Sequence, residues 1–266
     1  MPLNDAVSTF SISILPYLSK YNIRLPVIRP SEDFIKKMIE SNNHEKIISL
    51  RIEANQFQST MKLVSLNSFQ NVKSLTIFNF QDKKQIFQIR TYFSNLISLS
   101  LCYDGEIDFH KVLKIFELIP LSIKRFEIHC HSIRCSHYRL EHIFARLNDH
   151  NKSVQSFILY LDYVSQSIVN HCVQNHQKCV LRTIADFIRI MSKVQCVRII
   201  TIKSSVEPLL DADEWIGLMD MCKNMDKISL KTMKKISHDV KPTQQIEEIR
   251  KKLCNKRESM KFEVQI

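Results

Sequence analysis

A six-residue pattern of apolar positions, Φ-x-x-Φ-x-Φ, recurs along the chain. Its copies begin at Ile47, Val72, Leu96, Ile123, Val154, Val194 and Met225. The last two apolar positions of each copy lie two residues apart, so both side chains point to one face of a β-strand. Polar residues fill most of the intervening positions. Each copy therefore predicts a strand with one buried face.

Amphipathic segments with helical periodicity separate several of these strands. Apolar residues recur at three- and four-residue steps over 86–93, 112–119, 140–147, 181–191 and 246–253. Strand–helix units that repeat every 24 to 31 residues cannot bury their apolar faces alone, whereas stacked neighbours can. We therefore predict an α/β solenoid with a parallel sheet on its concave face, irregular towards the C-terminus. The alternative is a doubly wound α/β domain.

The pattern divides the chain into three parts. Residues 1–46 are predicted to form an N-terminal cap segment, because prolines interrupt them and Ser31 is a good helix N-cap. Residues 47–233 form the solenoid, in which 154–194 holds either an inserted helix or a degenerate repeat. Residues 234–266 form a C-terminal capping helix and a strand, since apolar residues alternate strictly from Met260 to Ile266.

The apolar skeleton resembles that of leucine-rich repeats, which place Asn three residues after the last apolar position of the pattern. That position, the Asn slot, here holds Asn55, Phe80, Asp104, His131, Asp162, Ile202 and Met233. The chain also has a helix that contains Trp215 and precedes a late strand. Together with the repeats, this helix makes the chain resemble the repeat region of F-box and leucine-rich-repeat proteins. The resemblance implies a leucine-rich-repeat-like solenoid that holds substrates for ubiquitin ligases. The F-box itself is expected to be absent, because Pro26 and Pro30 soon follow Leu15-Pro16.

Composition excludes several classes of protein. Only Gly105 and Gly217 are glycines, so the glycine clusters of P-loop and Rossmann nucleotide sites are missing. No run of 18 apolar residues predicts a membrane span, and the N-terminus lacks the features of a secretory signal. Eight cysteines scattered through apolar stretches are typical of reduced core packing. We therefore expect a cytoplasmic or nuclear protein without membrane contact.

The chain is basic, with a formal charge of +11. Its C-terminal third concentrates this charge, since residues 223–261 hold twelve Lys or Arg and five Asp or Glu. Such a stretch can bind nucleic acid or an acidic surface, and the candidate contacts are Lys251, Lys252, Lys256 and Arg257. No aromatic residues are interleaved with these charges, which argues against base stacking. A nucleic-acid or acidic-surface binder is therefore the alternative function.

The cysteines and histidines do not predict chemistry. His129, Cys130 and His131 precede Cys135, but no C-x-x-C occurs. Residues 129 and 130 lie on opposite faces of a strand, so both cannot ligate one ion without distortion. Nothing in the spacing indicates a Cys–His nucleophile pair. We expect no metal, no cofactor and no enzymatic activity.

The remaining function is binding on the face of the sheet away from the helices. Side chains predicted there include Thr76, Ser100, Cys102, Ile158, Ile200, Ser229 and Lys231. Because aromatic and charged side chains anchor protein interfaces, the candidate partner-binding residues are Arg51, Glu53, Phe78, Glu127, His129, Tyr160 and Arg198. The predicted function is a non-enzymatic protein–protein interaction scaffold, of the kind that recognises a substrate protein.

Overall fold

The computed structural model describes residues 48–63, 69–80, 83–108, 111–112, 115–116, 119–134, 153–164, 176–191, 193–204, 206–233 and 241–265. They form two compact units. Unit 1 contains the described residues through 102 together with 119–122, and unit 2 contains the others. The predicted cap segment 1–46 and the predicted helix at 140–147 lie outside the described residues.

Unit 1 alternates strands with helices. Its elements are β1 (Ser49–Glu53), α4 (Ala54–Leu63), β2 (Ser74–Phe78), α5 (Lys83–Tyr92) and β3 (Ser98–Cys102). The strands are parallel and adjacent in chain order. Their register pairs Leu75 with Leu99 and Ile77 with Leu101, and all four side chains are fully buried. The repeated apolar pairs therefore stack into one core, as predicted.

Unit 2 contains the longer run of parallel strands. Its main elements are β5 (Arg125–Cys130), β7 (Ser156–Leu161), α8 (His176–Arg189), β8 (Cys196–Thr201), η2 (Glu207–Leu209), α9 (Ala212–Met221), β9 (Lys227–Thr232), α10 (Lys241–Lys256) and β10 (Lys261–Gln265). The short strands β4 (Glu106–Asp108) and β6 (Ser132–Arg134) pair separately. Counting the strands of unit 1 as well, eight strands belong to a parallel sheet. The predicted α/β class is therefore confirmed.

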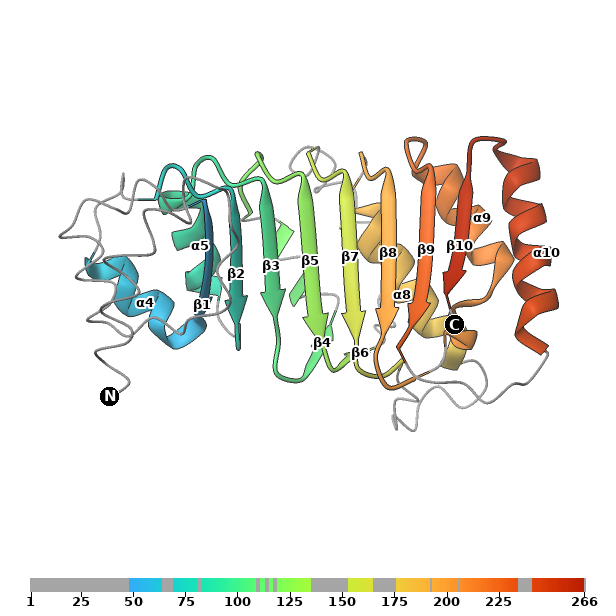
Figure 1. The fold of residues 1–266 in the computed structure, drawn as a ribbon, viewed down its shortest axis with the longest axis horizontal. Helices are drawn as coiled ribbons and strands as arrows, with labels where there is room; N and C mark the ends of the chain where they lie inside the picture. Colours follow the sequence, from blue (N-terminus) through green and yellow to red (C-terminus); the bar gives the residue numbers. More distant parts are fainter. Residues whose placement is uncertain are drawn as a thin grey trace, which may run out of the picture. The chain divides into compact units, whose positions relative to one another are not determined.

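Core residues of unit 2 repeat from strand to strand. The register aligns Phe126, Phe157, Val197, Ile228 and Phe262, and two residues later Ile128, Leu159, Ile199, Leu230 and Val264. Every member except Val264, on the last strand, is buried. The face they form packs under helices, and Figure 1 shows α8 and α9 on one side of β7, β8 and β9.

The helices of unit 2 bear out the sequence patterns. Helix α8 buries Ile184, Phe187 and Ile188, as the three- and four-residue steps predict. Helix α9 begins after Asp211, whose carboxylate accepts hydrogen bonds from the backbone N–H groups of Asp213 and Glu214. Capping of this kind satisfies amide groups that have no partner inside the helix. The interval 154–194 thus contains one described helix.

Helix α10 closes the end of the sheet in unit 2. Among the described strands, β10 pairs with β9 alone. On its other side, Arg250 Nε donates to the carbonyl of Phe262 at 3.2 Å, and Cys254 Sγ donates to the carbonyl of Met260 at 3.5 Å. Side chains of α10 therefore satisfy carbonyl groups of an edge strand, which would otherwise be open to pairing with another chain.

Candidate partner-binding site

The open face of unit 2 is the face of its sheet opposite α8 and α9. Parallel register arranges its side chains in rows that run across the strands. One row contains Glu127, Ile158, Arg198, Ser229 and Glu263, and the next contains His129, Tyr160, Ile200, Lys231 and Gln265. Four of the seven residues that the sequence predicts for partner binding, namely Glu127, His129, Tyr160 and Arg198, therefore lie on one surface.

A stacked pair of rings is the central feature of this face. The rings of His129 and Tyr160 lie on adjacent strands with centroids 3.9 Å apart and planes inclined by 14°. Both side chains are only partly buried. Cross-strand aromatic pairs stabilise each other and hold both rings in fixed positions. The open face thus presents a rigid, partly exposed aromatic platform.

Glu127 anchors one side of this platform. Its carboxylate accepts a hydrogen bond from Arg125 at 2.6 Å and lies 3.6 Å from His129 Nε2. Burial raises the pKa of the Glu127 carboxyl, but the hydrogen bonds from His129 and Arg125 outweigh it and bring the pKa below its ordinary value. Glu127 is therefore ionised at neutral pH and fixes the neighbouring imidazole.

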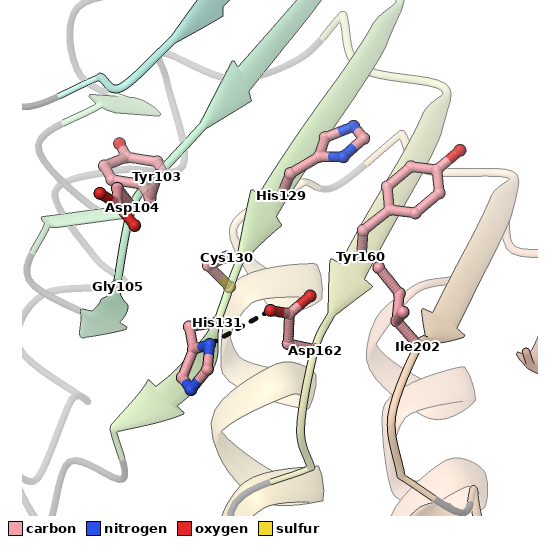
Figure 2. Close-up of a pocket in the computed structure, with 9 residues that line it drawn as sticks. All are labelled: Tyr103, Asp104, Gly105, His129, Cys130, His131, Tyr160, Asp162 and Ile202. Carbon is pink, nitrogen blue, oxygen red and sulfur yellow. Dashed lines mark hydrogen bonds and ion pairs between the residues drawn. The ribbon is translucent and has the colours of Figure 1, made fainter. Parts of the chain in front are cut away.

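A shallow pocket opens where the strands of this face end. Its cavity volume is about 170 Å³, and its lining residues are Tyr103, Asp104, Gly105, His129, Cys130, His131, Tyr160, Asp162 and Ile202. Figure 2 shows Tyr103 and Asp104 on one side and Tyr160 and Ile202 on the other, with the two histidines between them. All nine residues belong to unit 2. We call this cavity the carboxyl-end pocket.

Backbone hydrogen bonds extend the strand register into this pocket. The N–H of Tyr103 donates to the carbonyl of His129 at 2.7 Å, and the N–H of His131 donates to the carbonyl of Gly105 at 2.9 Å. Gly105 has φ +133°, a conformation that side chains disfavour. Beyond β7, the N–H of Ile202 donates to the carbonyl of Leu161 at 2.8 Å. The pocket residues are therefore held by backbone pairing.

Four side chains form a charged cluster at the rim. His131 Nδ1 and Lys203 Nζ lie 3.2 and 3.3 Å from the same oxygen of Asp162. Lys203 Nζ also lies 5.3 Å from the centroid of the Tyr163 ring, against which the ring of His131 packs edge-on. The cluster shows that a carboxylate and an aromatic ring hold a cation together at this position.

The thiol of Cys130 and the phenol of Tyr160 both line the pocket. Burial raises the pKa of the Cys130 thiol well above its ordinary range, and the Asp162 carboxylate adds to the increase. Burial, and then the charge of Glu127, raises the pKa of the Tyr160 phenol. Both groups are therefore protonated at neutral pH. No cluster of three potential metal ligands occurs among the residues that the structure describes.

The other three predicted residues lie on unit 1. Arg51 is exposed on β1, Glu53 accepts a hydrogen bond from Asn79 Nδ2 at 2.7 Å, and Phe78 is partly exposed on β2. Thr76 lies in register with Arg51. These side chains point away from the buried positions of their strands, as the period of two requires.

Several side chains predicted to be displayed on the open faces are buried instead. Ile158 is 3% exposed and Ile200 is 7% exposed, and Ser100 and Ser229 are also buried. The register gives the reason for Ile158, since it lies between the longer side chains of Glu127 and Arg198. The prediction from alternation was therefore wrong for these residues, because alternation fixes the face and neighbours decide the exposure.

The predicted basic contacts on α10 are largely engaged within the protein. Lys252 pairs with Glu248 at 3.0 Å and Lys256 pairs with Asp220 at 3.0 Å. Arg257 donates to the carbonyls of Met219 and Met225. Lys251 is exposed. The hydrogen bonds of Arg257 thus join the end of α10 to the region of α9, and this side chain stabilises the fold.

Sequence reasoning missed most of the carboxyl-end pocket, although a signal was present. Asp104, His131, Asp162 and Ile202 all occupy the Asn slot of the repeat pattern, three residues past the last apolar position of their strands. Successive parallel strands end at one edge of the sheet. Polar side chains at that slot are therefore brought to one place, which the pattern alone could have indicated.

Comparison of the chain with protein-family models finds no match, and comparison with curated proteins finds no similar sequence. The helices in the described part of the chain are too short or too polar to cross a bilayer.

Proposed function

We propose that the protein is a non-enzymatic interaction scaffold whose open face in unit 2 binds an extended, acidic segment of a partner protein. One observation carries the proposal: the His129–Tyr160 platform lies beside exposed cations without a counter-charge in the described structure. Aromatic and Arg side chains are the usual anchors of protein interfaces. An acidic segment matches both features of the face.

The ion pairs within the protein indicate which charge the partner should carry. The carboxylates of this face are already engaged, Glu127 with Arg125, Glu263 with Lys227 and Asp162 with Lys203. Arg198 and Lys231 are exposed, and no ion pair joins either of them to a described residue. They lie on adjacent strands, one row apart, at a Cα separation of roughly 8 Å. Two acidic side chains of an extended segment can reach both.

The order of the strands supports the architecture that we propose for this function. Within each unit the parallel strands neighbour one another in chain order, as they do in stacked repeats. We propose that the units are leucine-rich-repeat-like and that the protein acts as a substrate-recognition module of the F-box and leucine-rich-repeat type. The alternative is nucleic-acid binding through α10. Lys252, Lys256 and Arg257 do not support it, because each already has a partner within the fold.

Selection from a random peptide library tests the proposal directly on the protein. Phage displaying random 12-residue peptides would be selected on the full chain after depletion on a variant carrying Arg198→Glu and Lys231→Glu. We expect the selected peptides to be rich in Asp and Glu. Measured by fluorescence anisotropy, Tyr160→Ala should lower the affinity for a selected peptide by about thirtyfold, since interface aromatics contribute about 2 kcal/mol or more to binding.

A matched variant separates the two functions. Lys251→Glu with Lys252→Glu makes the same charge change on α10, and it should leave the affinity for the selected peptide within about twofold, since mutations at distant sites act independently. Buried Trp215 reports folding of each variant by fluorescence. The proposal would be refuted if the selected peptides were not enriched in acidic residues. It would also be refuted if the α10 variant lost more affinity for the peptide than the open-face variant.

A further inference from the structure

We propose that the carboxyl-end pocket binds a single cationic side chain, arginine or lysine, of a partner protein. The inference rests on the proposed function in one respect, since it assigns the side chain to the segment on the open face. The pocket would then recognise a basic side chain of a segment whose acidic side chains bind on the open face.

Charge is the first argument. The lining of this pocket includes Asp104 and Asp162 and neither Lys nor Arg, and Asp162 is engaged by Lys203 at the rim. Asp104 is exposed, and no hydrogen bond or ion pair joins its carboxylate to a described residue. The carboxylate of Asp104 is therefore the negative charge of this lining with which an incoming cation can pair.

Size is the second argument. Pockets for drug-sized ligands usually measure about 300–1,000 Å³, whereas this cavity measures about 170 Å³. It is therefore too small for most cofactors and suits one side chain. Because His129 and Tyr160 belong both to the lining and to the platform, a segment on the open face passes directly beside the opening.

Ring geometry is the third argument. Tyr103 and Tyr160 lie on opposite sides of the pocket, and the ring of His129 stacks on that of Tyr160 (Figure 2). Cations bind over the faces of aromatic rings. The protein already uses this chemistry at the rim, where Lys203 lies between the Asp162 carboxylate and the Tyr163 ring. Asp104 offers an incoming cation the same kind of counter-charge.

Blocked amino acids test the pocket independently of any peptide segment. The full chain, with ¹³C-labelled Tyr and His rings, would be titrated with Nα-acetyl-arginine methylamide, Nα-acetyl-lysine methylamide and the neutral citrulline analogue. Sodium phosphate would serve as an anion probe at matched ionic strength. We expect saturable shifts of the Tyr103, Tyr160 and His129 ring signals with one or both cations. Their relative affinities identify the preferred side chain.

Substitutions locate the binding and give the opposing outcomes. Asp104→Asn should weaken binding of the preferred cation about fivefold, the upper range for an exposed ion pair. Asp226→Asn is the control, because Asp226 is exposed before β9, at the other end of the strands. Equal shifts with citrulline, saturation by phosphate instead, or equal effects of the two substitutions would overturn the assignment. Failure here would leave selection of acidic peptides on the open face intact, so the two proposals fail separately.

Discussion

Leu159→Ala tests whether the two faces of β7 have the roles assigned to them. Leu159 is fully buried, and its register partners Ile128 and Ile199 are fully buried as well. The substitution removes three carbon atoms, a transfer loss of about 2.4 kcal/mol at about 0.8 kcal/mol for each buried methylene. The remaining cavity raises the cost to roughly 3–5 kcal/mol, because close-packed neighbours relax only in part.

The neighbouring residue provides the matched control. Tyr160→Ala removes a larger side chain from the same strand, but that side chain lies on the open face and is only partly buried. Its loss forfeits the stacking on His129, worth about 1 kcal/mol. The smaller truncation should therefore destabilise unit 2 by at least about 2 kcal/mol more than the larger one, because a core cavity costs more than a lost surface contact.

Urea unfolding followed by tryptophan fluorescence measures this difference. Trp215 is the only tryptophan. It is fully buried in α9, and its Nε1 donates to the carbonyl of Leu209 at 2.8 Å, so its emission reports unit 2. Equal slopes of free energy against urea would show that both variants unfold the same surface. Equal costs for the two substitutions, or a cost below about 1 kcal/mol for Leu159→Ala, would refute the assignment of the faces.

Two further predictions concern titration. Because hydrogen bonds lower the pKa of folded Glu127, this carboxylate stabilises the fold above its unfolded pKa and loses that contribution as pH falls through the folded value. The excess stability of wild type over Glu127→Gln in urea should therefore shrink below about pH 4.5, and a constant difference would contradict this. Burial raises the pKa of Cys222 to about 11. At pH 8 its alkylation by iodoacetamide should be about a hundredfold slower than in urea-unfolded chain, with half-buried Cys254 as the comparison in peptide mass spectra; similar rates at both cysteines would count against this account.

Local patterns predicted the elements well where one interaction dominates. The apolar pairs of Leu75 and Leu99 predict strands with one buried face, and both strands lie in parallel register. Asp211, Asp213 and Glu214 form the acidic start of α9, and the carboxylate of Asp211 caps this helix. These successes share a cause, because the alternation of apolar residues along a strand and the capping of a helix are both set by residues close in the sequence.

The sequence by itself determined the period of the repeats, the apolar face of each strand and the excess of positive charge. Tertiary structure decided which residues become neighbours across strands. Register brought His129 against Tyr160 and covered Ile158, and it gathered Asp104 and Asp162 into an acid-lined pocket on a basic chain. Residues 104 and 162 are far apart in the sequence, so no local pattern encodes their proximity. Backbone pairing between successive strands creates it, because parallel strands in register end at one edge of the sheet.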